Sequence, residues 1–171
     1  MIRRLWAIAA VAVAVLGPVT AASAESGPQT FLLYQGPGEA QFTVYAAGPI
    51  SGIGTDFLLA ERIDPSTGRT QRDTETVFPG GSTFNTLTVL ENSLQFDPRT
   101  CVARVTGRSH LDITGGTGDF EGVSGSGEVE FLAISISERT PQGCSRTEMR
   151  TYAIARITGT ADVPEDRSFT P

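Results

Sequence analysis

The glycine-rich segment ITGGTGDFEGVSGSG, which spans residues 113–127, decides the fold of this chain. Its glycines permit positive φ angles and close backbone approach, and we expect such a conformation at Gly116 or Gly118. Phe120 is the single large apolar side chain within the turn, so it should pin the turn onto a core. The segment lacks the third glycine of a dinucleotide loop, no Gly-Lys-Ser/Thr occurs, and no βαβ pattern surrounds it. It therefore predicts a structural turn between two strands, formed by Gly115, Gly116, Gly118, Phe120, Gly122 and Gly125.

Outside this segment the chain alternates β-rich runs with Gly, Pro and Asp turns. The predicted strands cover residues 41–47, 56–63, 74–78, 84–91, 94–96, 101–113, 128–137 and 150–157. A slip in the alternation near residues 132–133 indicates a bulge. Strands at this spacing favour a sandwich or a barrel, but the Trp that an immunoglobulin sandwich places between its two cysteines is missing. The strand pattern therefore predicts one all-β domain of about eight strands, either a sandwich or a barrel, and a barrel would also remove the edge strands.

The N-terminus has the three parts of a secretory signal peptide. Arg3 and Arg4 are followed by an uncharged apolar run over residues 5–16, and small residues precede a cleavage site after Ala24. A membrane anchor is the alternative, but a span needs about 20 apolar residues. We therefore expect residues 1–24 to be a cleaved signal peptide and the mature protein to be secreted, extracellular and without a membrane span. Residues 25–30 are expected to be a flexible N-terminus, and residues 161–171 a polar, disordered tail.

Charge and cysteine content limit the partners. Without residues 1–24 the chain keeps 11 Arg and 19 acidic residues, a net charge of −8, which disfavours nucleic acid and anionic lipid. Cys101 and Cys144 are an even pair, so we expect a disulfide in an exported protein. The lone His110 and the two cysteines show no metal-ligand spacing, and no motif indicates a cofactor.

The glycine segment also resembles a known family. Gly115-Gly116-Thr117-Gly118-x-Phe120-x-Gly122-Val123-x-Gly125 is similar to the signature of allene oxide cyclase and dirigent proteins, and Phe96-Asp97-Pro98-x-Thr100-Cys101 looks like their small exported bacterial members. The resemblance covers residues 31–160. It implies an eight-stranded antiparallel barrel with an apolar cavity, which in the plant relatives steers cyclisation or radical coupling of a hydrophobic substrate. The matched motif is structural and brings no catalytic residue with it.

Three polar side chains are candidates for the barrel lumen, namely Tyr45, Glu91 and Tyr152. Glu91 shares a face with Leu87 and Val89, so in a lumen it would be a carboxylate with a raised pKa; the alternative is a solvated strand end. An inward Tyr could donate a hydrogen bond to a ligand, although packing is the commoner role. His110 falls in register with an exposed polar row, so a Ser-His-acid triad is not expected. The sequence does not identify catalytic residues.

These features predict an exported β-barrel that binds a small hydrophobic molecule in its lumen or serves as a stable extracellular domain. One alternative is an isomerase or cyclase that folds an apolar substrate by shape. Another is a secreted inhibitor or adhesion domain that works through its loops, of which residues 64–83 are the longest candidate. The filling of the lumen separates these alternatives, because eight strands leave room for packed side chains or for one small ligand. The sequence leaves the oligomeric state open.

Overall fold

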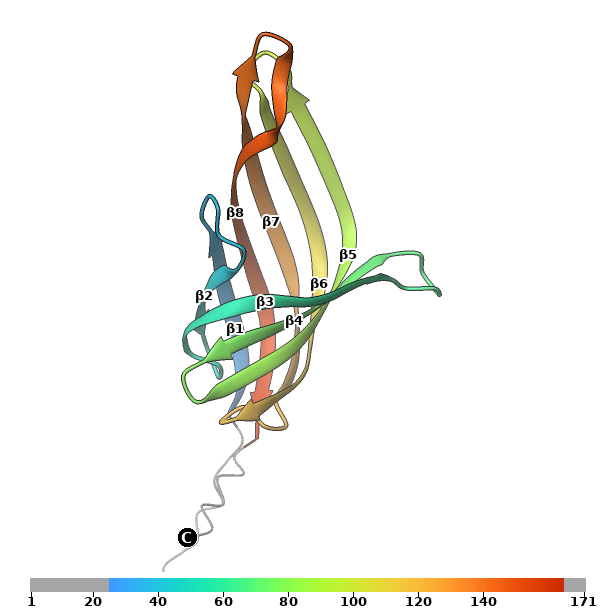
Figure 1. Ribbon diagram of the computed structural model, residues 1–171. Helices are drawn as coiled ribbons and strands as arrows, with labels where there is room; N and C mark the ends of the chain where they lie inside the picture. Colours follow the sequence, from blue (N-terminus) through green and yellow to red (C-terminus); the bar gives the residue numbers. More distant parts are fainter. Residues whose placement is uncertain (1–24, 165–171) are drawn as a thin grey trace, which may run out of the picture.

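A computed structural model describes residues 25–164 apart from the side chains of Arg146 and Glu148; the predicted signal peptide and residues 165–171 lie outside the described part. The described chain consists of eight strands and their connections (Figure 1). They are β1 (Glu25–Gln35), β2 (Phe42–Ala47), β3 (Gly52–Ile63), β4 (Thr70–Phe78), β5 (Gly81–Asp97), β6 (Val102–Gly118), β7 (Ser124–Thr140) and β8 (Gly143–Val163). Within residues 25–164, no helix is long and apolar enough to cross a membrane.

The strands form one antiparallel sheet that closes on itself. Each strand pairs with the next in sequence, and β8 pairs with β1 from Glu25↔Val163 to Gln35↔Ala153. The predicted all-β, antiparallel arrangement that closes through eight strands is therefore confirmed. The space inside this ring is called the lumen below.

The strand boundaries differ from the sequence-based expectation at both ends of the chain. Residues 25–30, expected to be flexible, belong to β1 and pair with the end of β8. The same pairing extends β8 through Ala161 to Val163, into the segment expected to be a disordered tail. Backbone pairing between β1 and β8 holds these polar segments in strands. Their composition alone does not predict this pairing.

Three predictions for the middle of the chain also differ from the structure. Residues 84–91 and 94–96 form one strand, β5, which bends at a register shift between Val89 and Glu91. The register of β7 is regular at residues 132–133, and its irregularity lies between Ser137 and Arg139. The predicted long loop over residues 64–83 is mostly strand, and only the tip over residues 64–69 connects β3 to β4.

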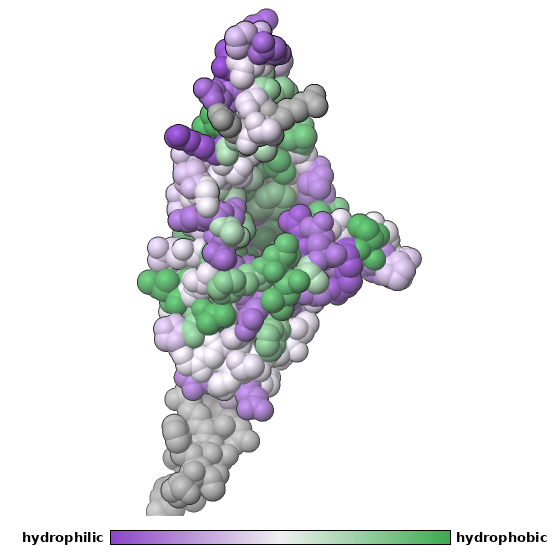
Figure 2. All heavy atoms as spheres, in the orientation of Figure 1, coloured by the Kyte–Doolittle hydropathy of each residue, from purple (hydrophilic) through white to green (hydrophobic). Residues whose placement is uncertain are grey.

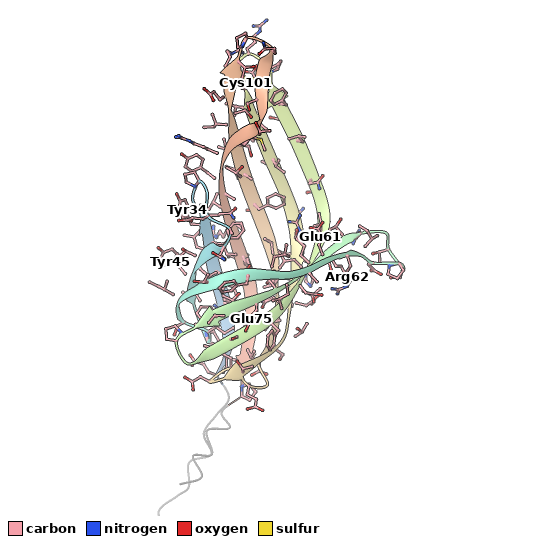
Figure 3. All side chains as sticks on the ribbon, in the orientation of Figure 1. Tyr34, Tyr45, Glu61, Arg62, Glu75 and Cys101 are labelled. Carbon is pink, nitrogen blue, oxygen red and sulfur yellow. A yellow bond between two sulfur atoms is a disulfide. The ribbon has the colours of Figure 1, made fainter. Side chains whose placement is uncertain are left out.

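The four strands β5–β8 are longer than the other four and continue beyond the ring (Figure 1). We call this part the extension: β5 from Val89 to Asp97, β8 from Gly143 to Tyr152, and the segments of β6 and β7 between them. Here β5 lacks a β4 neighbour and β8 lacks a β1 neighbour. A disulfide joins Cys101 and Cys144 at the far tip, as predicted (Figure 3).

The opposite end of the ring is closed by apolar side chains. Phe120, from the glycine turn, packs against Phe78 with ring centroids 5.5 Å apart, so its predicted anchoring role is confirmed. Gly118 has a φ of 60°, and a Cβ there would lie 2.1 Å from the Gly80 carbonyl oxygen. Gly116 is constrained by space instead, because its Cβ would lie 2.4 Å from the Phe120 oxygen. The turn therefore requires glycine at both positions, for two different reasons.

Candidate functional site

The lumen is not filled by side chains. It holds a cavity of about 340 Å³ that opens toward the extension. Most of its lining is apolar and comes from Phe31, Leu33, Phe42, Leu58, Leu87, Val89, Leu111, Val129, Phe131, Ala153, Ala155 and Ile157. Figure 2 shows a hollow with apolar side chains between the long strands and the crossing β3–β4 ribbon. The cavity falls at the lower end of the size range of small-molecule sites.

The apolar surface continues from the cavity along the inner face of the extension. Past the register shift in β5, Leu94 pairs with Val105 and Phe96 pairs with Ala103, which places these residues on the same inner face. Leu94 is 69% exposed and Phe96 is 53% exposed, since no strand lies opposite them. An apolar molecule could therefore contact apolar surface along this face before it reaches the cavity.

Asp56 is the central polar group of the cavity. It lies on β3 opposite Phe42 of β2 and Thr76 of β4, and all three side chains point inward. The hydroxyl of Thr76 donates a hydrogen bond of 2.7 Å to its Oδ1 atom. Burial raises the pKa of the Asp56 carboxyl to about 6, because desolvation outweighs the hydrogen bonds from Thr76 and Thr74. The carboxyl therefore changes charge near neutral pH.

Two further polar side chains, Asn85 and Ser109, line the cavity. The Asn85 amide nitrogen donates to the Thr76 hydroxyl at 3.2 Å and to the Thr74 hydroxyl at 3.4 Å. Among the described residues, no donor reaches the Asn85 carbonyl oxygen and no partner reaches the Ser109 hydroxyl, although both side chains line the cavity. Since no fully buried side-chain polar atom of residues 25–164 lacks a partner, both atoms reach cavity space. They offer a ligand one acceptor and one hydroxyl.

An ion pair lies at the mouth of the cavity. Arg72 Nε of β4 is 2.6 Å from Glu61 Oε2 of β3, and both side chains are half exposed. On the other side of the same ribbon, Arg62 pairs with Asp73. Glu61 and Arg62 mark the start of the projecting ribbon in Figure 3. Such exposed pairs contribute little stability. The main effect of the Glu61–Arg72 pair is that its two charges neutralise each other at the opening of the cavity.

The three sequence-predicted lumen groups all lie on the outer face. Tyr45 is 49% exposed and pairs with Leu32 of β1, whose neighbours Phe31 and Leu33 point inward; Figure 3 shows it outside the ribbon. Tyr152 is 38% exposed and alternates with the inward Ala153. These placements correct the expectation of inward tyrosines: Tyr45 lies on the face opposite Phe42 and Val44, and the direction of Tyr152 was ambiguous because both faces of β8 carry apolar residues.

Glu91 is displaced from the lumen by the register shift in β5. Its expected neighbours Leu87 and Val89 do line the cavity, but the extra residue after Val89 turns Glu91 to the outer face. There it lies opposite Arg108 at 3.7 Å, with 64% of its side chain exposed. Strict alternation predicted the wrong face because a bulge inverts it.

His110 also lies on the outer face, as its register predicted. Its ring contacts Glu128 at 3.0 Å and Asp112 at 3.3 Å, and the hydrogen bond to Glu128 is the main cause of its raised pKa. Within residues 25–164, no group of three His, Cys, Asp or Glu side chains is placed to hold a metal ion.

Sequence reasoning missed the polar end of the cavity altogether. The polar side chains at this end come from four strands and share no motif. They are Asp56, Thr74, Thr76, Asn85 and Ser109. One signal was present: Asp56 stands where the alternation of β3, between Gly54 and Leu58, calls for an inward residue. A lone acid at an inward position is the kind of exception that marks a functional site.

Comparisons of this chain with protein-family models, curated proteins and solved structures find no match. The chemistry of the site therefore rests on its own geometry: an apolar cavity, open at one end, with a single titratable carboxyl near its closed end.

Proposed function

We propose that this chain is an exported protein of the allene oxide cyclase/dirigent type that binds a small, largely apolar molecule in its lumen. The observation that supports this proposal is the open cavity of about 340 Å³. An eight-stranded ring can be filled completely by its own side chains, and a purely structural domain has no use for the hollow. Leaving such apolar surface in contact with water costs about 25 cal/mol for each Å², which a bound ligand recovers.

The polar end of the cavity would orient a bound ligand. Thr74, Thr76 and Asn85 are held to one another by hydrogen bonds, so their positions are fixed before a ligand arrives. A ligand that placed one polar group against them and its apolar body along Leu87 and Phe131 would satisfy both parts of the lining.

Binding can be tested with 4-phenylbutan-1-ol, a neutral molecule with one hydroxyl, by isothermal titration calorimetry. We expect saturable one-to-one binding with a negative heat-capacity change, which marks burial of apolar surface. Ala153→Phe would fill the cavity and should abolish binding, whereas the matched Ala47→Phe, at an exposed position, should leave it unchanged. Absence of binding to the unmutated protein, or equal binding by the two variants, would contradict the proposal.

A second candidate function is catalysis by an isomerase or cyclase, and Asp56 is the observation that favours it. A carboxyl with a pKa of about 6 in an apolar cavity can act as a general acid or base near neutral pH. If a substrate is turned over, Asp56→Asn should lower kcat by roughly 10²–10⁴-fold and leave the affinity for the neutral alcohol within about threefold. A variant that retains full activity would exclude Asp56 as the catalytic group.

A further inference from the structure

The charges that line the cavity do not balance. Three of its lining side chains are charged: Asp56, Glu61 and Arg72. Glu61 and Arg72 pair with each other at the mouth, which leaves Asp56 at the inner end. Within residues 25–164, Asp56 forms no salt bridge, and the groups that act on its carboxyl besides burial are the hydroxyls of Thr76 and Thr74. An ionised Asp56 therefore has hydrogen-bond donors but no counter-charge.

Aromatic side chains line the same cavity as this carboxyl. Phe42 lies directly opposite Asp56 across the β2–β3 pair. Phe31 and Phe131 line the same cavity from β1 and β7. A carboxylate combined with aromatic faces attracts organic cations, because the ring quadrupole and the negative charge act in the same direction.

We propose that the preferred ligand is a small lipophilic amine, whose ammonium group pairs with Asp56 while its apolar body occupies the cavity and the inner face of the extension. This inference rests on the lumen-binding function proposed above. Asn85 lies beside Asp56 through their shared partner Thr76, and its carbonyl oxygen can accept another N–H group of the ammonium. A carboxylate ligand of the same size would bring a second negative charge beside Asp56 into an apolar site, so the lumen selects against it.

Three probes of equal length separate this inference from lumen binding in general: 4-phenylbutylamine, 4-phenylbutan-1-ol and 4-phenylbutanoate. Each is titrated calorimetrically into the unmutated, oxidised protein at about pH 7.5, where Asp56 is ionised. We expect the amine to bind at least about tenfold more tightly than the alcohol, and the alcohol more tightly than the acid. This ranking needs no variant, so it does not depend on whether a substitution folds.

The variant Asp56→Asn then tests whether the carboxylate causes the ranking. It should reduce amine affinity to that of the same variant for the alcohol or below, and a far-UV circular dichroism spectrum equal to that of the unmutated protein reports an intact fold. Asp162→Asn, which removes an exposed aspartate elsewhere on the ring, should preserve the ranking.

Two failures are distinguishable. If the alcohol binds and the amine has no advantage, or Asp56→Asn keeps the advantage, the amine inference is wrong and lumen binding stands. If none of the three probes binds, the lumen-binding function fails, and the amine inference fails with it.

Discussion

Replacing Asp56 by asparagine is expected to stabilise the protein at neutral pH, because it removes a charge that folding takes out of water. The pKa of the carboxyl rises from its ordinary 3.8 to about 6 in the folded protein, mainly through burial. At 1.36 kcal/mol for each tenfold change in proton affinity, this rise corresponds to about 3 kcal/mol. Asparagine keeps the shape and an oxygen that can accept from Thr76, and it does not titrate.

The direction in which the free energy of unfolding changes with pH depends on whether the folded or the unfolded state ionises Asp56 first. Below about pH 3 the carboxyl is mostly neutral in both states, and its burial carries no charge penalty. As the pH rises toward 6, the unfolded chain ionises Asp56 before the folded protein does, so the free energy of unfolding falls. Above about pH 7 both states are ionised and the loss is complete.

Urea unfolding of the oxidised protein, followed by far-UV circular dichroism at several pH values between about 4 and 8, measures this effect. The quantity of interest is the difference in unfolding free energy between Asp56→Asn and the unmutated protein, because most other titrating groups cancel in it. We expect this difference to shift in favour of the variant by about 2 to 3 kcal/mol from the acid to the alkaline end. Asp162→Asn should show no comparable trend. A difference for Asp56→Asn that stays constant with pH would refute the argument that Asp56 is desolvated.

The remaining predictions concern the disulfide and the glycine turn. Thiol titration of the denatured, unreduced protein should find no free thiol, and replacing both Cys101 and Cys144 by serine should lower the unfolding free energy by up to about 4 kcal/mol, the chain-entropy value for a bond across 43 residues; two reactive thiols would disprove the bond. Gly118→Ala should destabilise by more than about 1 kcal/mol, because its φ is positive and the new Cβ would meet the Gly80 oxygen. Gly27→Ala, whose Cβ would have 3.8 Å to its nearest neighbour, is the matched control, and equal melting temperatures for the two variants would contradict the steric argument.

Several features of the fold could be read from the sequence because they depend on local chemistry. Alternating β-branched and aromatic residues, with Gly and Pro between the runs, indicated an antiparallel all-β chain, and the structure confirms it. The glycine turn with Phe120 as its anchor and the pairing of Cys101 with Cys144 followed from residue types alone. Each of these requires only that certain residues occur at certain positions.

Only the tertiary structure decided which face of each strand became the interior. A period of two separates two faces but does not name the inner one when both carry apolar residues, as around Tyr152. The bulge after Val89 inverted the alternation and sent Glu91 outward, while the pairing of β4 with both β3 and β5 brought Asp56 and Asn85 together through the threonines of β4. Register between strands is set by the whole ring, so the site that it assembles has no signature in any single segment.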